Sequence, residues 1–328
     1  MVNRRFLLKQ QALKVNRRLR RLLQTFFVVL LVAISMLLAY LSLSRDVLKS
    51  EPLPTEELVG KDYNYLEEMD DVFISVKTTR HYHKGRLPII LATWFQLAKE
   101  QTWFFTDIYD EEFQLKTHGH MINTNCSSFH DHKGLCCKMS AEFDAFINTN
   151  KKWFCHFDDD NYVNVPRLMH FLSNYSARED WYLGKPSVLS PWEIIGKDNQ
   201  KVIFSFATGG AGFCLSRALT LKMIPVAGGG KFISVGEKIG LADDMTMGYI
   251  IGRLVMTPLT AVDQFHSHLE SLRIIRRERF SDQITFSYSP QDNYWNTVKI
   301  EGFHATYDPS RFLSLHCFLF PYFKFCPR

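Results

Sequence analysis

The strongest constraint on this chain is an uncharged stretch of 22 residues, LLQTFFVVLLVAISMLLAYLSL, at residues 22–43. As a helix, this stretch is long enough to cross the roughly 30 Å hydrocarbon core of a bilayer. The alternative is a cleaved signal peptide, but its apolar region would be only about 7 to 15 residues long and would end at a small-residue cleavage site. The length therefore favours a permanent transmembrane anchor.

The residues before this stretch predict how the anchor is oriented. Residues 1–21 contain eight Lys and Arg and no Asp or Glu. Such residues stay on the cytoplasmic side, so residues 1–21 are predicted to be a cytoplasmic tail and the part beyond residue 43 to be lumenal, as in a single-pass type II protein. The remaining 31 basic residues face 34 acidic ones, a net charge of −3. We therefore expect no nucleic-acid partner.

The cysteine content is compatible with an oxidising lumen. Seven cysteines follow the anchor, at positions 126, 136, 137, 155, 214, 317 and 326, where disulfides can form. Because the number is odd, at least one is expected to be free. Structural zinc is disfavoured, since no C-x-x-C pair or matching Cys/His set occurs at zinc spacing. Sequons at Asn125 and Asn174 are also compatible with a lumenal location.

The sequence pattern changes near residue 69. Residues 44–68 contain Pro52, Pro54, several Glu and little apolar periodicity, which is typical of a stem. Beyond them, strand-like runs at 71–78, 102–107, near 121 and at 153–157 alternate with helical patterns at 86–100 and about 137–148. Such alternation predicts an α/β domain over residues 69–328, with a mixed, mainly parallel sheet, flanking helices and ligands beyond the carboxyl ends of strands.

Three adjacent carboxylates, Asp158, Asp159 and Asp160, follow the apolar strand WFCHF, and Asn164 is predicted to cap the helix that comes next. Their mutual repulsion is most simply relieved by a cation, and oxygen ligands of this kind suit Mg²⁺ or Mn²⁺ together with substrate phosphates. A solvated acidic turn is the alternative, but the position after a buried strand favours the metal. An EF-hand is excluded, because the sixth and twelfth loop positions hold Val163 and Met169 instead of Gly and Glu.

Three further stretches are candidate parts of the same site. FATGGAGFC includes Gly209 and Gly210, which would let the backbone approach a ligand closely, although a tight structural turn explains them equally well. LADDMTMGYIIGRL opens a predicted helix with Asp243 and Asp244, which would also favour the positive end of a helix dipole. In QFHSHLE, two histidines could bind a metal or simply be structural.

Taken together, these segments resemble the Fringe family of β1,3-N-acetylglucosaminyltransferases. The resemblance is carried by six segments, in the family's order: DVFISVKTTRHYH, KWFCHFDDDNYVN, YLGKPS, FATGGAGFC, FHSHLE and DPSRFLSLHC. It implies a GT-A type nucleotide-sugar domain, Mn²⁺ as cofactor and UDP-GlcNAc as donor. It further implies O-linked fucose on EGF-like repeats of Notch-type receptors as acceptor, and residence in the Golgi membrane.

The resemblance also implies roles for single residues. Asp160 and His268 would bind the metal, and Asp244 would be the catalytic base. The donor side would include Thr78, Thr79, Arg80, Asp158, Asp159, Gly209 and Gly210. The chain departs from the family at Ser205, where Trp is usual, at Ala242, where Pro is usual, and at Met245, where Cys is usual.

Disulfide pairs follow only from the resemblance, because seven cysteines allow many pairings. It implies the pairs Cys126–Cys137, Cys155–Cys214 and Cys317–Cys326, with Cys136 free. Two alternatives to the implied function remain: a β1,3-galactosyl- or glucosyltransferase with the same fold, since acids and metal recognise phosphate and not the hexose, and a non-catalytic lumenal lectin or chaperone.

Overall fold

The computed structural model describes residues 30–31, 34–36, 68–188, 190–195 and 201–327, and the chain divides into two units, Met1–Asp62 and Tyr63–Arg328. In the first unit, the described residues are helical. Within the described ranges, no helix is both long and apolar enough to span a membrane. The predicted tail (1–21), nearly all of the predicted anchor (22–43) and the predicted stem (44–68) lie outside the described residues, so they remain predictions.

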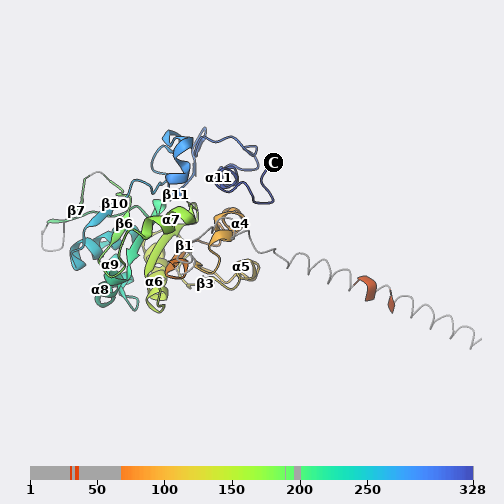
Figure 1. Cartoon of the computed structure of the whole chain (residues 1–328). Coiled ribbons are helices and arrows are strands. Elements are labelled where there is room, and N and C mark those ends of the chain that lie inside the picture. Colours follow the sequence, from red (N-terminus) through yellow and green to blue (C-terminus); the bar gives the residue numbers. More distant parts are fainter. Residues whose placement is uncertain (1–29, 32–33, 37–67, 189, 196–200, 328) are drawn as a thin grey trace, which may run out of the picture. The chain divides into compact units, whose positions relative to one another are not determined.

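The second unit is built on a seven-stranded sheet in the order β10-β6-β9-β4-β1-β2-β3 (Figure 1). Six strands share one direction, and β9 alone is antiparallel to its neighbours β4 and β6. The mixed, mainly parallel sheet with flanking helices is therefore confirmed. The strand bounds are β1 Val72–Lys77, β2 Thr102–Thr106, β3 Met121–Asn123, β4 Trp153–Asp158, β6 Tyr182–Gly184, β9 Phe213–Ser216 and β10 Leu259–Ala261.

Three two-stranded pairs and a set of helices complete the unit. The pairs are β5 Tyr162–Val163 with β11 Thr285–Phe286, β7 Trp192–Ile195 with β8 Lys201–Phe204, and β12 Ser289–Pro290 with β13 Trp295–Asn296. The helices are α4 Leu87–Ala92, α5 Glu111–Lys116, α6 His132–Ile147, α7 Val165–Leu172, α8 Arg217–Ala227, α9 Lys231–Ile239, α10 Asp243–Tyr249 and α11 Phe312–Leu319. A π-helical segment, Ile250–Val255, continues α10, and short 3₁₀ turns connect other elements.

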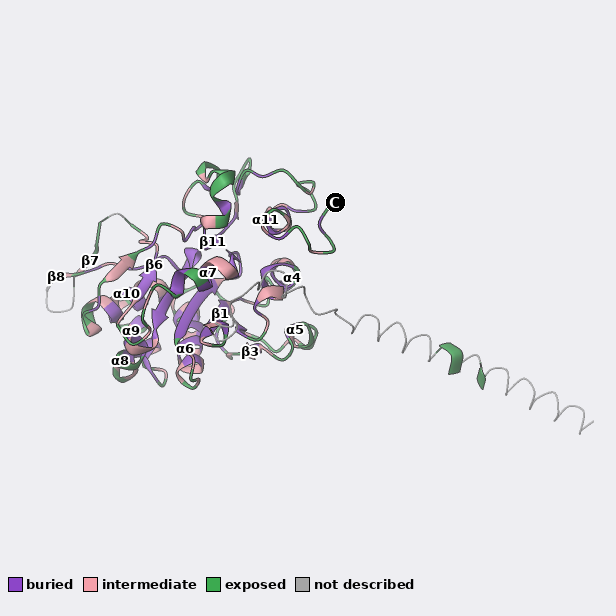
Figure 2. Cartoon of the chain, viewed as in Figure 1, coloured by how far each residue is buried: buried purple, intermediate pink, exposed green. Residues whose placement is uncertain are grey.

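Alternation along the central strands produces two hydrophobic cores, because successive side chains of a strand point to opposite faces. In β1, Val72, Ile74 and Val76 belong to one core, which includes residues of α4, α7 and α11. Phe73 points the other way, into a core that includes residues of α6, α8, α9 and α10. The sheet is therefore covered on both faces, and the buried strands lie between exposed helix surfaces (Figure 2).

Three local predictions differ from the structure. The helix predicted over 86–100 ends at Ala92, where Thr93 turns its hydroxyl back to the carbonyl of Ile89, and a 3₁₀ turn follows. The helix predicted from about residue 137 begins at His132, because Asp131 caps it through the backbone N–H of Gly134. Asn164 does occupy the N-cap position of α7, but its amide donates to the carbonyls of Ser281 and Gln283 instead of capping the helix.

The disulfides implied by the family resemblance are confirmed. The structure pairs Cys126 with Cys137, Cys155 with Cys214 and Cys317 with Cys326, and Cys136 is a buried free thiol. Cys155 and Cys214 face each other in the β4–β9 register. This disulfide therefore joins the one antiparallel strand to the strand that leads into the three carboxylates.

Candidate active site

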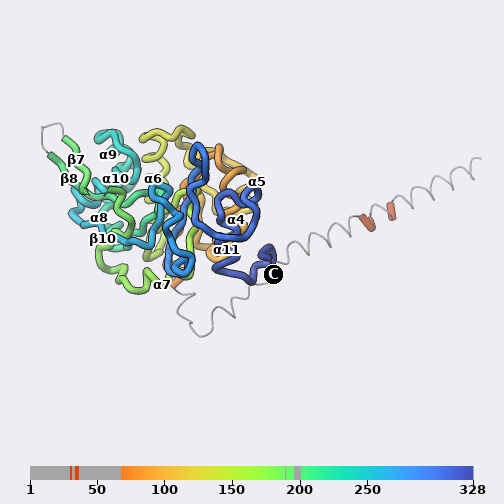
Figure 3. The backbone as a smooth tube through the Cα atoms, turned by 90° about the horizontal axis from the view of Figure 1, so that it is seen from above, coloured from red at the N-terminus to blue at the C-terminus, as the bar shows by residue number. Residues whose placement is uncertain are grey.

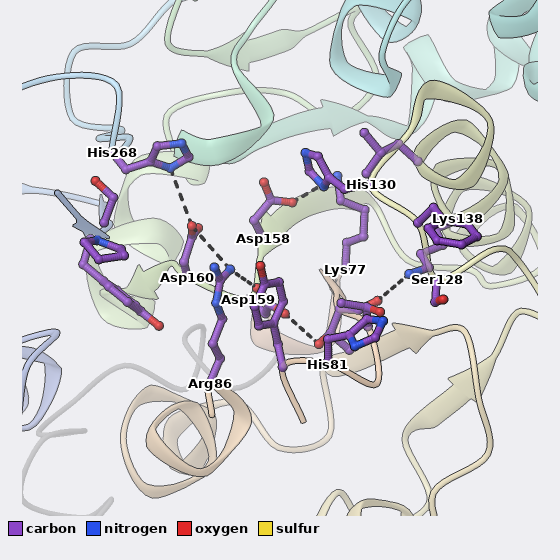
Figure 4. A pocket seen from close by; sticks show the side chains of 18 residues that line it. Lys77, His81, Arg86, Ser128, His130, Lys138, Asp158, Asp159, Asp160 and His268 are labelled. Atoms are coloured by element: carbon purple, nitrogen blue, oxygen red, sulfur yellow. Dashed lines mark hydrogen bonds and ion pairs between the residues drawn. The ribbon is translucent and has the colours of Figure 1, made fainter. Parts of the chain in front are cut away.

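The acidic triplet lies at the carboxyl edge of the sheet, beside a cavity of about 590 Å³ (Figure 4). Strand β4 ends at Asp158, and Asp159 and Asp160 follow in the turn. Thr78, Thr79, His268 and the three carboxylates line the cavity, whereas Arg80, Gly209, Gly210 and Asp244 are not among its lining residues. The three acids have different partners, so one motif supplies three different environments.

Both carboxylate oxygens of Asp159 already have partners within the protein. Its Oδ2 accepts a hydrogen bond of 2.7 Å from Thr78, and its Oδ1 lies 2.5 Å from the guanidinium of Arg86. Burial raises the pKa of Asp159, although both partners act to lower it. Because neither oxygen is free, Asp159 and Thr78 position the cavity wall, and a direct ligand role for Asp159 would require these contacts to rearrange.

Asp158 belongs to a buried charge network centred on Lys77. The ammonium of Lys77 lies 3.0 Å from Asp158 Oδ1 and 2.5 Å from Asp243 Oδ2. Burial acts to lower the pKa of Lys77, but the carboxylates of Asp158 and Asp243 outweigh it and raise that pKa well above its ordinary value. Lys77 is therefore a fixed positive charge between the cavity and the helix that begins with Asp243.

His156 continues this network beneath the cavity. Its Nδ1 lies 2.6 Å from Glu142 Oε2, which also accepts a hydrogen bond from Ser75, and its Nε2 lies 3.5 Å from Asp158 Oδ1. Burial alone would lower the pKa of His156, but the carboxylate of Glu142 and the bond to Asp158 raise it to about 9. The imidazole is thus a second buried cation, and it faces the acidic triplet from inside the sheet.

The raised pKa of His156 predicts a pH-dependent stability. Since the pKa rises from 6.5 to about 9 on folding, the stabilisation, of order 3 kcal/mol, is present below pH 6.5 and is lost as the pH rises through 9. We expect urea unfolding of the second unit, residues 63–328, to give a free energy that falls over this window. Glu142→Gln, which removes the largest attraction, should flatten the dependence; an equally steep curve in this variant would contradict the assignment.

Asp160 and His268 face each other across the mouth of the cavity (Figure 4). Asp160 Oδ2 lies 3.5 Å from His268 Nδ1, and both Asp160 Oδ1 and His268 Nδ1 are buried atoms without a hydrogen-bond partner. Burial and the neighbouring carboxylate of Asp158 raise the pKa of Asp160 well above its ordinary value. Burial lowers the pKa of His268, so its imidazole is neutral at neutral pH and keeps a lone pair.

These two side chains fit a divalent cation such as Mn²⁺. They offer one carboxylate oxygen and one imidazole nitrogen, both of which Mn²⁺ accepts, and their unpartnered atoms are buried polar groups that otherwise cost free energy. Within the described ranges, no third His, Cys, Asp or Glu completes a cluster that could hold a metal by itself. Such a site is typical of ions bound through one or two protein groups together with substrate phosphates.

Asp244 lies behind the glycine loop and opens α10 together with Asp243. Its Oδ2 accepts a hydrogen bond of 3.2 Å from the backbone N–H of Gly209. A Cβ added at Gly209 would stand 3.5 Å from Asp244, and one added at Gly210 would stand 3.1 Å from the ring of His268. The two glycines therefore allow the backbone to pass between Asp244 and His268, which explains their place in the motif.

The electrostatics of Asp244 suit a proton acceptor. Burial and the adjacent carboxylate of Asp243 raise its pKa to about 6. A base near this value is ionised at neutral pH and still has appreciable proton affinity. The predicted base is therefore placed beside the site, separated from the donor cavity by the glycine loop.

Thr79 and Arg80, which were also predicted to contact the nucleotide, lie in the loop after β1 and are both hydrogen-bonded to Asp107. Thr79 donates its hydroxyl to Asp107, and the backbone N–H of Arg80 donates to the same carboxylate at 3.0 Å. The side chain of Arg80 is exposed and does not line the cavity. Arg80 therefore contributes to the loop through its backbone, while its predicted nucleotide contact stays a prediction.

Several site residues were missed by sequence reasoning. Lys77 is the last residue of β1, and Asp158 is the last residue of the neighbouring parallel strand β4. Because parallel strands end at the same edge of a sheet, the contact between Lys77 and the acids could have been predicted. Arg86 had no sequence signal: it reaches Asp159 from the first turn before α4. Among the departures, Ala242 has φ −61°, the value that proline imposes, so this substitution leaves the start of α10 unchanged.

Comparisons with known proteins find close relatives of this chain. A family model described as Fringe-like matches residues 67–323. The Fringe glycosyltransferase of Drosophila melanogaster is 63% identical over 265 residues, which cover 79% of this chain and 64% of the fly protein. The β-1,3-N-acetylglucosaminyltransferase radical fringe of Gallus gallus is 49% identical over 267 residues, which cover 80% of this chain and 72% of the chicken protein.

A solved structure shows only a slight likeness. The glycosyltransferase GlyE of Streptococcus pneumoniae TIGR4 overlaps with 59% of this chain and 45% of its own, at a TM-score of 0.33 and 12% identity.

Proposed function

This chain belongs to the Fringe family, and we propose that it transfers N-acetylglucosamine from UDP-GlcNAc, in β1,3 linkage, to fucose O-linked to EGF-like repeats of Notch-type receptors. The proposal includes a GT-A type domain held in the Golgi lumen by the predicted anchor at residues 22–43. The names of the similar proteins support the donor sugar. The observation that carries the proposal is the facing pair Asp160 and His268 beside the acid-lined cavity, each of which has one buried atom without a hydrogen-bond partner.

The donor would lie in the cavity with its diphosphate toward Asp160 and His268. Mn²⁺ bound to these two residues would supply Lewis-acid charge at the phosphate oxygens of the leaving UDP. The chain itself contributes Lys77 and Arg86, which keep Asp158 and Asp159 ionised and in place. Thr78 fixes Asp159, so the cavity wall is preorganised before the donor binds.

The acceptor would approach from the side of Asp244. The carboxylate of Asp244 takes the proton of the fucose 3-hydroxyl as that oxygen attacks the anomeric carbon of GlcNAc. The bond from this carbon to UDP breaks, and UDP leaves with the bonding electrons. A single displacement inverts the configuration, so an α-linked donor gives a β linkage. No enzyme nucleophile is required, and the buried thiol of Cys136, whose pKa burial raises to about 11, is a poor nucleophile in any case.

The proposal is tested by a choice of donors. The purified lumenal part is given UDP-GlcNAc, UDP-Gal or UDP-Glc with an O-fucosylated EGF-like repeat, in Mn²⁺ or in EDTA. We expect transfer of GlcNAc alone, abolished by EDTA. Transfer of galactose or glucose would indicate a transferase with the same fold and a different donor specificity. Binding of UDP without any transfer would favour the hypothesis of a non-catalytic lectin.

The raised pKa of Asp244 predicts the acid limb of the pH profile. The base must be ionised, so kcat/KM measured at saturating Mn²⁺ should rise through a pKa of about 6 and fall tenfold per pH unit below it. Asp243→Asn removes the neighbouring charge that raises this pKa, so the limb should move to lower pH. A limb that stays in place in this variant would show that another group controls it.

A further inference from the structure

We propose that Asn296 is a positioning residue that holds His268 in place for metal binding and joins it to the strand pair that forms one wall of the cavity. This inference rests on the proposed function, in which His268 binds Mn²⁺, and extends it to a side chain that does not line the cavity. It is drawn from the hydrogen bonds of one buried amide and from the place of that amide in the fold.

His268 lies in an irregular part of the chain, between β10 and the 3₁₀ turn Leu272–Ile274. No strand ladder or helix fixes its backbone there. Across the turn, the N–H of Glu270 reaches the carbonyl of Ser267 only at 3.4 Å. The direction of the His268 side chain therefore depends on contacts from other parts of the chain.

Asn296 supplies such contacts with both ends of its amide. The amide nitrogen donates to the carbonyls of His268 and Glu270, at 3.0 Å and 2.7 Å. The amide oxygen accepts from the N–H of Leu272 at 3.1 Å. Asn296 is 6% exposed, so these bonds are shielded from water. Both donor hydrogens and the acceptor of this side chain are thus used on one turn, and one bond ends at the backbone of His268 itself.

A separate cluster fixes the beginning of the same turn. The carboxylate of Glu270 accepts from the N–H of Ser267 at 3.2 Å and forms an ion pair of 2.7 Å with Lys185. The ring of His266 lies 3.1 Å from that carboxylate. These contacts reach the residues on either side of His268. Among the described residues, no side chain other than Asn296 is hydrogen-bonded to the backbone of His268, so its position depends on this one amide.

The strand that carries Asn296 belongs to a wall of the cavity. Asn296 lies in β13, opposite Ser289 of β12 in the register. Tyr288, Ser289 and Pro290 line the cavity. In Figure 3, the blue part of the chain that contains this strand pair and the turn of His268 lies between α10 and α4. The amide therefore joins the wall of the cavity to the predicted metal ligand, and a shift of one is passed to the other.

The test compares two buried asparagines with similar contacts. Asn164 is 4% exposed, and its amide also donates to two backbone carbonyls, those of Ser281 and Gln283. Asn296→Asp and Asn164→Asp therefore replace equivalent donors and add the same buried charge, but only the first acts on the turn of His268. Asn296→Ala removes the bonds without adding a charge, and it serves as a second variant if the carboxylate prevents folding.

Two properties of the full-length chain are measured in the presence of UDP. Calorimetry gives the dissociation constant for Mn²⁺, and electron spin echo modulation detects the nitrogen of an imidazole bound to Mn²⁺. We expect that constant to rise about tenfold to a hundredfold in both Asn296 variants, the usual effect of losing a group that orients a metal ligand. Their nitrogen signal should weaken. Asn164→Asp should keep the parent affinity and signal, even where urea unfolding shows that it has lost stability.

Three results would overturn the inference. Parent affinity and nitrogen signal in the Asn296 variants would show that His268 is held without this amide. An equal loss of affinity in Asn164→Asp would mean that both changes loosen the whole domain. A parent chain that binds Mn²⁺ with UDP but gives no nitrogen signal would remove the metal role of His268 from the proposed function, whereas the first two results would leave that role intact.

Discussion

Replacing Asp244 by Asn should lower kcat about 10²- to 10⁴-fold, the usual contribution of a general base. Asn keeps the volume and one acceptor oxygen, so the bond from the N–H of Gly209 can persist while the ability to take a proton is lost. Binding of UDP should change little, because Asp244 does not line the donor cavity. Initial rates and UDP binding by calorimetry, at saturating Mn²⁺, measure both quantities.

Asp263→Asn provides the control, because that carboxylate is exposed and lies in the loop after β10. It should retain the parent kcat. If Asp244→Asn kept more than a tenth of the parent kcat, another group would be the proton acceptor. If it lost UDP binding in parallel, Asp244 would be needed for the shape of the cavity and not for the chemistry.

Replacing Asp160 by Asn should reduce transfer by more than about a hundredfold and raise the Mn²⁺ concentration needed for half-maximal rate by at least tenfold, as expected for loss of a metal ligand. The same change should stabilise the metal-free protein. Burial and neighbouring charge raise the pKa of Asp160, so its ionised form is unfavourable in the folded chain at neutral pH, and a neutral amide removes that cost. Urea unfolding in EDTA measures the gain.

Asp159→Asn is the matched control, since it removes one charge from the adjacent position. Burial raises the pKa of Asp159 as well, but its carboxylate is the nearest ion-pair partner of Arg86 and accepts from Thr78. Removing that charge leaves the partly buried guanidinium without this partner, so the variant should lose stability in EDTA, the opposite sign to Asp160→Asn. Mn²⁺ should stabilise the parent against urea by mass action and should have little effect on Asp160→Asn. If both variants changed stability in the same direction, the three carboxylates would not have the separate environments described above.

The sheet and the place of the acids could be predicted because both depend on local pattern. An apolar run such as WFCHF forms a buried strand wherever it lies, and residues that follow a parallel strand must come to the ligand-binding edge. The different environments of Asp158, Asp159 and Asp160 were not predicted, because they depend on Lys77 at the end of β1, Arg86 at the N-cap of α4 and His156 within β4. Strand pairing and alternation could have placed Lys77 and His156 near Asp158, whereas no spacing in the sequence encodes the contact of Arg86.

The errors in local structure have the same origin. Asn164 has the composition of a helix cap, but tertiary carbonyls at Ser281 and Gln283 compete for its amide. The pattern of 86–100 reads as one helix, but Thr93 interrupts it. The disulfide pairs could not be predicted from helix caps or from periodicity, since their connectivity depends on the fold. Only the family resemblance implied them.

The Cys155–Cys214 disulfide has a consequence for when the enzyme becomes active. Cys155 precedes the acidic triplet by three residues and Cys214 follows Gly210 by four, so one covalent bond links the strand that leads into the acids to the strand that follows the glycine loop, whose Gly209 is hydrogen-bonded to Asp244. A chain made without an oxidant would contain every catalytic side chain but would lack the covalent bond between β4 and β9. Maturation of activity is thereby tied to oxidation, and because both cysteines are fully buried in the folded sheet, a reductant should reach this bond only when the sheet opens, so catalysis and fold should be lost together.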